Sequence, residues 1–543
     1  MGTYLNVGIT KFKEAINSQI YVDKTRMISY LNSLINTKQK YVCVSRPRRF
    51  GKTTTLDMLA AYYDREANSK DLFENFEIGS QKNGYDYINS FEVLSINMVT
   101  FFNNKSIKDG VNYLEKIVTK ELVRKYENID YLDQNNLSLV MSDIYSQTGN
   151  LFVILIDEWD CIFRRYREDK EGQILYLDFL RDWLKDQPYI ALAYMTGILP
   201  IKKYGEHSAL NMFDEYSMIE PMQLAEYAGF TDDEVQEICT KYNLNYEEIK
   251  KWYDGYALSG HIPISDRTGG ANIRENKFDI YSPVSVVKSA LTGKLLNYWN
   301  ETETAEALKQ YIKRNYAGLK EDVIMLMNGG RISVDVTTYQ NDMTTFHSKD
   351  DIFTLLVHLG YLGYDNFQKE IYIPNNEVKD VFRQTTNDEE WNYLSKILNN
   401  SQRLLEATWN HDERTVAELI EKAHDKTGNK TYNSEAALSY AIQLAYYSAQ
   451  NYYTLIQELD TGKGYADLVY IPAPEYANKP VILIELKYEK DAQTAVEQIK
   501  KQDYPAGLEH YKGNIIIVGI NYDREKTNTS TNFKHHSCKI ELA

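Results

Sequence analysis

The chain of 543 residues has few cysteines, and their arrangement suggests neither a metal finger nor a disulfide framework. The four cysteines, Cys43, Cys161, Cys239 and Cys538, lie far apart and include no CxxC pair. Such usage is typical of reduced thiols in a cytosolic protein, because small secreted domains pair their cysteines. Disulfide-linked and zinc-finger classes are therefore not expected.

The sequence also lacks a long apolar run. No uninterrupted apolar stretch reaches the roughly 18 to 20 residues that a membrane span needs. The N-terminus has no basic segment followed by an apolar core, the pattern of a signal peptide. We therefore predict no membrane association and a cytoplasmic location.

Basic residues are in deficit, with 61 Lys and Arg against 77 Asp and Glu and a net charge of −16. Such a chain does not coat nucleic acid indiscriminately, because neutralising phosphates needs a basic surface, although a local basic groove remains compatible. With 43% hydrophobic and 25% charged residues, the composition is that of a globular protein. At this length about two to four domains are expected.

A phosphate-binding loop is indicated near the N-terminus. The run 41–45 reads as a short strand, and after a turn Gly51-Lys52-Thr53 opens a helical pattern. In this order the backbone N–H groups cradle phosphates, Lys52 reaches the outer phosphates and the Thr53 hydroxyl binds Mg²⁺. The usual motif has a glycine five residues before Gly51, where this chain has Arg46. The alternative is an ordinary basic turn that enters a helix.

An acidic pair follows a second buried strand. The apolar run 151–156 ends at Asp157 and Glu158, and a continuous apolar run is typical of a parallel strand covered on both faces. Beside a phosphate-binding loop, Asp157 is predicted to hold Mg²⁺ and Glu158 to polarise the attacking water. The alternative is a strand ending in a solvated acidic turn. Thr196, after the predicted strand 189–195, is a candidate γ-phosphate sensor or a simple turn residue.

The middle of the chain carries no recognisable chemistry. The pattern from 221 is helical, and residues 231–235 form a capping-box sequence. Residues 259–276 are polar and glycine-containing, which predicts a surface loop. A short strand is predicted at 371–373.

A second chemical centre lies in what looks like a separate domain from about residue 401. One predicted strand carries Asp467, and the next carries Glu485 and Lys487. Residues i and i+2 of a strand share a face, and burying both charges is costly unless they meet a metal, each other or a substrate. Two carboxylates on Mg²⁺ with a lysine near the attacking water make a phosphodiesterase site. The alternative is a structural salt bridge on an edge strand.

This Asp…Glu-x-Lys pattern resembles the PD-(D/E)XK nuclease fold, as does the order helix, hairpin, strand, helix, strand. Glu458 is a candidate further metal ligand, Glu435 is its weaker alternative, and Gln498 lies on the helix after the core strands. Residues 401–543 hold 16 Lys and Arg against 20 Asp and Glu, a net charge of −4. That balance disfavours tight nonspecific DNA binding, so a weak, guided or RNA-directed activity stays open.

Taken together, the chain resembles bacterial AAA-ATPase-like proteins that carry a C-terminal PD-(D/E)XK nuclease domain. The resemblance spans nearly the whole length and implies that Arg46 replaces the first loop glycine, as in that family. The family has an arginine where this chain has Tyr465, which removes a possible phosphate contact. The motifs that carry the resemblance are 21–25, 45–53, 156–158, 196–198, 252–256, 373–378, 464–467 and 485–487.

The expected fold class is α/β, with an N-terminal AAA-like P-loop NTPase parallel sheet, a helical appendage and a C-terminal α/β PD-(D/E)XK nuclease-like domain. The expected boundaries are 1–220 for the ATPase-like domain, 221–400 for a mainly helical lid and connector, and 401–543 for the nuclease-like domain. The candidate ATP-binding residues are Arg48, Arg49, Phe50, Gly51, Lys52, Thr53, Thr54, Asp157 and Thr196. The candidate metal ligands are Thr53, Asp157, Glu458, Asp467 and Glu485, and the candidate catalytic residues are Glu158, Asp467, Glu485 and Lys487.

The expected function is ATP binding and hydrolysis coupled to a Mg²⁺-dependent nuclease that acts on DNA or RNA, with a homo-oligomer compatible. The alternative is a non-catalytic regulator that binds ATP and nucleic acid through degenerate sites. A small-molecule kinase is disfavoured, because the pair Asp157-Glu158 suits activation of water better than transfer to a hydroxyl.

Overall fold

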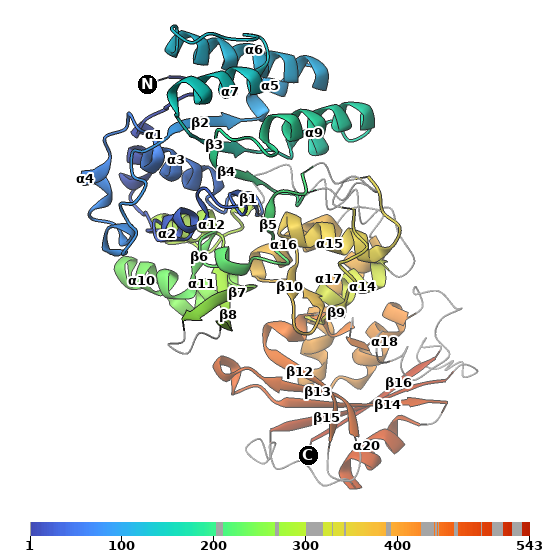
Figure 1. The fold of residues 1–543 in the computed structure, drawn as a ribbon. Coiled ribbons are helices and arrows are strands. Elements are labelled where there is room, and N and C mark those ends of the chain that lie inside the picture. The colour runs from blue at the N-terminus through green and yellow to red at the C-terminus, as the bar shows by residue number, and fades with distance from the viewer. Residues whose placement is uncertain are drawn as a thin grey trace. The chain divides into compact units, whose positions relative to one another are not determined.

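The chain folds into two compact units, each described by itself (Figure 1). The first comprises Met1–Leu319 with Arg331–Val381, and the second Lys320–Gly330 with Phe382–Ala543. The computed structural model describes residues 2–542 except 202–209, 266–270, 300–318, 328, 341–343, 387–391, 425–438, 440–441, 444, 461–464, 490, 502–513 and 524–534. Within these ranges no helix is long and apolar enough to cross a membrane.

A five-stranded, fully parallel sheet forms the centre of the first unit, in the order β2-β3-β4-β1-β5. The pairs Asn97↔Asp157, Asp157↔Thr196 and Ser45↔Gly197 align the carboxyl ends of β2, β3, β4 and β1 along one edge. Ligands of open α/β sheets bind at such an edge. The strands are β1 Tyr41–Ser45, β2 Glu92–Asn97, β3 Phe152–Asp157, β4 Ile190–Gly197 and β5 Asp214–Tyr216.

Both faces of this sheet are covered, since every residue of β1, β3 and β4 is buried. On one face, Leu56 and Leu59 of α3 share an apolar cluster with Val42 and Val153 of the sheet. Burial on both faces explains the uninterrupted apolar runs of these strands. The helices of this part are α1 Thr10–Ile16, α2 Met27–Leu34, α3 Lys52–Tyr63, α4 Lys70–Phe73, α5 Val99–Phe102, α6 Ile107–Lys125, α7 Leu137–Thr148, α8 Cys161–Arg165 and α9 Lys170–Leu184.

A smaller helical and β-hairpin layer follows in the same unit. The predicted capping box is confirmed, because Thr231 and Glu234 bond reciprocally at the start of α10. The surface loop predicted at 259–276 is wrong for 259–265 and 271–276, because β7 and β8 pair there as antiparallel strands, whereas 266–270 lie outside the described residues. A backbone ladder can form between polar residues, so composition did not reveal it. The elements are β6 Phe230–Thr231, α10 Asp232–Tyr242, α11 Tyr246–Tyr253, β7 Tyr256–Ser265, β8 Ala271–Tyr281 and α12 Pro283–Thr292.

The described part of residues 319–386 contains α14, α15, α16 and a small antiparallel sheet, ordered β10-β11-β9. All of α14 except Leu319 belongs to the second unit, and α16 begins in the first unit and ends in the second. The strand predicted at 371–373 is present, one residue earlier, as β11. The elements are α14 Leu319–Met327, β9 Ile332–Ser333, α15 Lys349–Leu359, β10 Gly363–Asp365, β11 Glu370–Tyr372 and α16 Asn376–Thr386.

The second unit contains a mixed five-stranded sheet, ordered β12-β13-β14-β15-β16. Only β14 and β15 pair in parallel, and Val496 and Ile499 of α20 pack against Leu483 and Ile517 of these strands. The predicted fold class, a parallel α/β sheet followed by a mixed α/β domain, is confirmed. The elements are α17 Asn392–Trp409, α18 Glu413–His424, β12 Tyr453–Asp460, β13 Tyr465–Pro472, β14 Val481–Tyr488, α20 Ala492–Lys501, β15 Ile515–Tyr522 and β16 His536–Leu542.

Candidate functional sites

The loop between β1 and α3 has the strand–loop–helix form of a phosphate-binding site. β1 ends at Ser45 and α3 begins at Lys52, with Gly51 in the N-cap position. Arg49 and Gly51 have left-handed φ angles of 70° and 82°, a conformation that is uncommon for a residue with a side chain. The helix therefore presents its first N–H groups at the carboxyl edge of the sheet, where an anion is favoured.

Arg46, in place of the usual first glycine, is fully buried and serves the fold. Its guanidinium donates to the main-chain oxygens of Ser45, Tyr216 and Leu224 at 2.9, 2.7 and 3.3 Å. Burial lowers its pKa to about 10. Arg46 thus ties the end of β1 to β5 and to the 3₁₀ turn Met222–Leu224, and it lines neither of the pockets described below.

Lys52 is bonded within its own loop. Its ammonium donates to the carbonyl oxygens of Arg46 and Pro47 at 3.0 and 2.7 Å. Burial lowers the pKa of Lys52 to about 8, although the negative charges of Glu158 and Asp160 act in the opposite direction. The exchange of these two carbonyl partners for phosphate oxygens stays a prediction.

The structure brings together the predicted magnesium ligands of the first site. Thr53 Oγ1 donates to Asp157 Oδ2 at 2.9 Å, and Asn97 Nδ2 lies 3.3 Å from the same oxygen. Burial raises the pKa of Asp157, which the Thr53 hydrogen bond and the charge of Lys52 partly offset. Neither the sequence motif nor its spacing indicated Asn97, which reaches the site because β2 pairs with β3.

These groups fit a magnesium ion bound together with a nucleotide. Thr53 and Asp157 supply hard oxygen donors, and Mg²⁺ is usually held by one or two such groups with waters and substrate phosphates. No cluster of three or more His, Cys, Asp or Glu residues able to hold a metal occurs in the described part of the chain. A complete protein cage is not needed in a site of this kind.

Glu158 follows Asp157 with a φ of 52° and forms an ion pair with Arg164 of α8. The same guanidinium bonds Asp160, with Nε 3.0 Å from Oδ2. Asp160 is fully buried and also accepts the main-chain N–H of Leu199 at 2.9 Å. Arg164 and Asp160 were not predicted from the sequence. Their i, i+4 spacing at the start of a helix is one that favours an ion pair, and it could have indicated them.

Thr196 stands beside Asp157 in the sheet, as its place after a predicted strand suggested. Its side chain is fully buried, and the hydroxyl donates to the carbonyl oxygen of Val44 at 3.0 Å. The hydroxyl therefore bonds the neighbouring strand β1, and a contact with a γ-phosphate stays a prediction.

A cationic pocket of about 930 Å³ opens over the loop and the start of α3. Its lining includes Arg48, Arg49, Lys52, Thr53 and Thr54 of the predicted set. Further cations come from other elements, and Glu158 is the one carboxylate among the described residues that line the pocket. The charge suits a polyphosphate. The remaining cationic lining residues are Lys11, Arg164 and Arg165.

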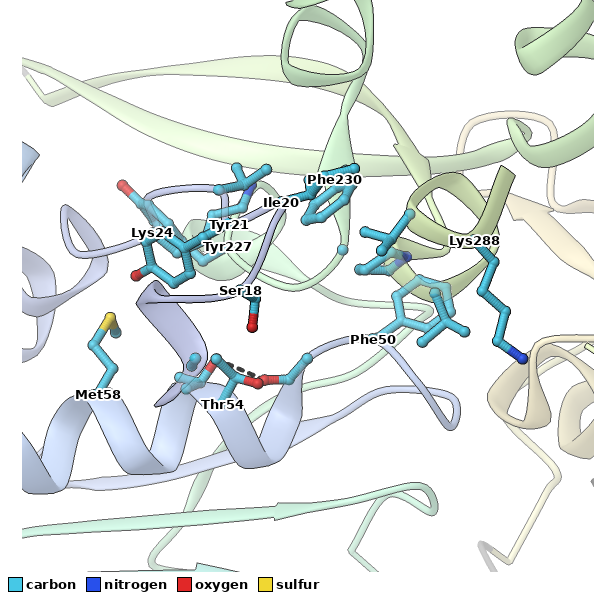
Figure 2. A pocket seen from close by; sticks show the side chains of 18 residues that line it. Ser18, Ile20, Tyr21, Lys24, Phe50, Thr54, Met58, Tyr227, Phe230 and Lys288 are labelled. Carbon is cyan, nitrogen blue, oxygen red and sulfur yellow. Dashed lines mark hydrogen bonds between the residues drawn. The ribbon is translucent and has the colours of Figure 1, made fainter. Parts of the chain in front are cut away.

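An apolar cavity of about 490 Å³ adjoins the cationic pocket, and the two share Gly51, Thr54, Pro283 and Val284. Figure 2 shows the aromatic rings of its lining, with Thr54 of α3 beneath them. Flat apolar walls of this kind suit a nucleoside base. The sequence analysis did not find this cavity, because its walls come from distant segments. Its labelled aromatic residues are Tyr21, Phe50, Tyr227 and Phe230.

In the second unit, β13 and β14 bring together the predicted nuclease residues. The register Leu468↔Ile484 places Asp467 beside Glu485, and Asp467 Oδ2 accepts the N–H of Leu486 at 2.7 Å. Glu485 is 2% exposed and Lys487 6%, and their side chains form an ion pair of 2.7 Å. The two side chains share a face, as the i, i+2 spacing predicted, and they meet each other in an ion pair. A metal-binding role for Glu485 stays a prediction beside the alternative of a structural salt bridge.

Helix α20 completes this cluster. Gln498 Nε2 donates to Glu485 Oε1 at 2.6 Å. Helix α20 can lie close to the sheet because Gly519 of β15, which pairs with Glu485 of β14, has no side chain. A Cβ on Gly519 would lie 2.3 Å from the carbonyl oxygen of Ala492 in α20. The carboxylates of Asp467 and Glu485 are suitable Mg²⁺ ligands. The side chain of Glu458 and the whole of Glu435 lie outside the described residues.

Two family models match the chain. Residues 6–205 match the family described as predicted AAA-ATPase, and residues 438–532 match the PD-(D/E)XK nuclease superfamily. An uncharacterized protein encoded in the vnfD 5′ region of Azotobacter chroococcum is 24% identical over 315 residues, which are 55% of this chain and 54% of that protein. A Walker-type ATPase of Pyrococcus abyssi aligns with 66% of this chain and 94% of its own at 14% identity and a TM-score of 0.31.

The chain therefore contains a region that matches the predicted AAA-ATPase family and, after it, a region that matches the PD-(D/E)XK nuclease superfamily, in the order that the motifs predicted. The aligned segment spans about half the length of the Azotobacter relative.

Proposed function

We propose that the first unit binds and hydrolyses ATP with Mg²⁺, and that the second unit cleaves nucleic-acid phosphodiesters with a divalent metal. The observation that carries the first part is the 2.9 Å hydrogen bond between Thr53 and Asp157. It joins the phosphate-loop helix to the acidic end of β3 next to the cationic pocket. These are the relative positions that Mg²⁺-nucleotide chemistry requires.

The two adjoining pockets suggest how ATP is placed. The base enters the apolar cavity, and the triphosphate extends past Gly51 and Thr54, which line both spaces, into the cationic pocket. Lys52 then releases the Arg46 and Pro47 carbonyls and bonds to phosphate oxygens. The N–H groups at the start of α3 bind the same phosphates.

Hydrolysis needs a base near the γ-phosphate, and Glu158 lines the cationic pocket for that role. Thr53 and Asp157 would hold Mg²⁺, which neutralises developing phosphate charge when bound. Released from Arg164, Glu158 accepts a proton from the attacking water. The water oxygen forms the new bond to the γ-phosphorus, the bond to the β–γ bridging oxygen breaks, and ADP leaves with the electron pair.

The second site has the donors for phosphodiester hydrolysis. Asp467 and Glu485 would hold the metal, which acidifies the attacking water when bound. Lys487, paired with Glu485, orients that water or stabilises charge developing on the phosphate. Gln498 fixes the Glu485 carboxylate. Nucleic acid, DNA or RNA, is the proposed substrate class because its phosphodiester suits this donor set.

The alternative proposal is a non-catalytic regulator that binds both ligands. Two features favour it: Glu158 forms an ion pair with Arg164, and Tyr465 stands where the resemblance implies an arginine. A regulator would bind ATP without turnover and nucleic acid without cleavage.

The test uses the 543-residue chain with Mg²⁺-ATP. The Lys52→Ala variant is expected to lose ATP binding, and Glu158→Gln to bind ATP while turnover falls about 100-fold or more, because the base is lost. The control Glu171→Gln changes an exposed glutamate on α9 and is expected to behave as wild type. Undiminished turnover in Glu158→Gln would refute the hydrolytic assignment.

The second site is tested by metal-dependent cleavage of single- and double-stranded DNA and RNA, with and without ATP. Asp467→Ala and Lys487→Ala are each expected to abolish cleavage, whereas Glu497→Ala on the exposed face of α20 leaves it unchanged. If the wild-type chain cleaves nothing under any of these conditions, the regulator is the better description.

A further inference from the structure

Two sequence motifs of the first unit line neither pocket, namely Trp252–Tyr256 and Ile373–Val378. They pack against each other. Gly255 has a φ of 113°, and a Cβ there would lie 2.0 Å from the carbonyl oxygen of Pro374. Tyr372, just before the second motif, donates its hydroxyl to the oxygen of Gly255 at 2.9 Å. The two motifs therefore form one interlocked structure, and any effect on the pockets is indirect.

Glu377, the acidic residue of the second motif, is 1% exposed and receives three hydrogen bonds. Its Oε1 accepts the main-chain N–H groups of Tyr298 and Trp299 at 2.7 and 3.0 Å. Its Oε2 accepts the Ser285 hydroxyl at 2.8 Å. Burial raises the pKa of Glu377 to about 7, whereas these bonds and the charge of Arg49 act to lower it. The carboxylate therefore fixes the backbone at 298–299.

That backbone segment also contacts the phosphate-binding loop. Arg49 Nη1 donates to the carbonyl oxygen of Tyr298 at 3.0 Å. The ring of Phe50 meets the indole of Trp299 edge to face, with centroids 6.4 Å apart. Tyr298 and Trp299 thus donate their N–H groups to Glu377, while the carbonyl oxygen of Tyr298 and the indole of Trp299 contact the loop.

The first motif reaches the loop as well. Phe50 packs edge to face on Tyr256 at 5.4 Å, and the Tyr256 hydroxyl donates to the oxygen of Gly360 at 2.6 Å. A Cβ on Gly360, whose φ is 86°, would lie 2.8 Å from both Pro47 and Trp299. The phosphate-binding loop therefore packs closely against these residues, which leaves it little room to move.

We propose that Glu377 is a positioning residue for nucleotide binding, which acts by holding the 298–299 backbone against Arg49 and Phe50. Arg49 lines the cationic pocket and Phe50 lines the apolar cavity, so one carboxylate outside both pockets influences both. The inference rests on the proposed function, because it takes the loop to be a nucleotide site. It assigns a role to motifs that carry no chemistry of their own.

The experiment measures binding of Mg²⁺-ADP to the 543-residue chain by calorimetry, together with KM and kcat for ATP. Glu377→Ala is expected to raise the ADP Kd and the KM about tenfold with a smaller change in kcat, because a misplaced Arg49 loses one charge-assisted hydrogen bond to phosphate. Glu377→Gln is expected to restore most of the affinity, since its amide oxygen can still accept both N–H groups and its NH₂ can donate to Ser285.

A matched control separates positioning from general loss of stability. Val378→Ala removes buried volume from the next residue of α16 and is expected to lower the melting temperature while leaving the ADP Kd unchanged. Equal loss of affinity in Val378→Ala and Glu377→Ala would overturn the inference. So would an unchanged Kd in a folded Glu377→Ala variant.

A double-mutant cycle tests whether Glu377 acts through Arg49. Adding Glu377→Ala to Arg49→Ala is expected to change the ADP Kd by less than about twofold, because the two residues act in one chain of contacts. If the losses of ADP affinity in Glu377→Ala and Arg49→Ala add fully in the double variant, Glu377 does not act through Arg49. Failure of the proposed function is a distinct result, in which the wild type binds no ADP or Lys52→Ala binds it as tightly as the wild type.

Discussion

The ammonium of Lys52 lies 2.7 Å from the carbonyl oxygen of Pro47, inside the loop that it is expected to open for phosphate. The lysine thereby satisfies the carbonyl oxygens of both Arg46 and Pro47. Nucleotide binding must replace these bonds with stronger ones to phosphate, and it must do so with a charged lysine.

Nucleotide affinity is predicted to fall as the pH rises above about 8. The pKa of Lys52 is lowered by burial to about 8, so above that pH the nucleotide-free protein must take up a proton to bind phosphate. We expect the Kd of Mg²⁺-ADP to rise by about tenfold per pH unit in this range. Calorimetry in buffers of different ionisation enthalpy measures both the Kd and the proton uptake.

The control for this pH effect is Lys52→Arg, whose guanidinium stays charged over this pH range. This variant should bind Mg²⁺-ADP more weakly than the wild type, but its Kd should not rise with pH. An equal slope in Lys52→Arg would assign the titration to another group. The sign for stability is opposite. Because the unfolded lysine keeps its proton to about 10.5, this group makes the nucleotide-free fold more stable as the pH rises from about 8 to 10.5.

Arg46→Gly is predicted to damage the protein although it restores the usual loop glycine. The change removes the donor for the carbonyls of Ser45, Tyr216 and Leu224 in a fully buried place. We expect a loss of roughly 3 kcal/mol or more in the free energy of unfolding. Chemical denaturation measures it, and tighter ADP binding with unchanged stability would show that Arg46 has no such structural role.

Thr53→Val is predicted to weaken the magnesium dependence of nucleotide binding. The substitution keeps the side-chain shape but removes the hydroxyl that lies 2.9 Å from Asp157. We expect the Kd for ADP to rise about tenfold with Mg²⁺ and little without it, because one metal ligand is lost. Thr55→Val, two residues along α3, is the control and should keep the full magnesium effect.

Gln498→Ala is predicted to reduce metal-dependent cleavage about 10- to 100-fold, the usual effect of losing a residue that orients a metal ligand. Gln498 donates to Glu485 at 2.6 Å, so its loss frees that carboxylate to turn. Gln493→Ala on the same helix is the matched control, since Gln493 bonds Glu541 instead. Cleavage assays over a Mg²⁺ and Mn²⁺ titration measure the effect, and similar rates in both variants would count against the site.

The sequence was most informative where the chemistry is local. The loop 45–53, the acids after β3 and the i, i+2 pair of β14 are each contained in a few residues, so strand and helix periodicity located them. The two family regions and the fold class follow from the same local patterns.

The sequence was least informative where distant segments meet. The guanidinium of Arg46 bonds residues 170 and 178 positions away, so its structural role is invisible in the motif itself. The apolar cavity is built from four segments between residues 15 and 288. The β7–β8 pairing was missed for another reason. Leu258, Ile262 and Ile264 alternate along β7, but they are interleaved with Gly260 and polar residues, whose composition indicated a loop.

The cationic pocket has a consequence for the rate of association. The chain has a net charge of −16, which disfavours the approach of polyanions on balance, whereas six of the described residues that line this pocket are Lys or Arg. Such a contrast concentrates the field at one opening and guides a diffusing nucleotide to it. The association rate constant should therefore decline steeply as ionic strength rises, while dissociation responds much less.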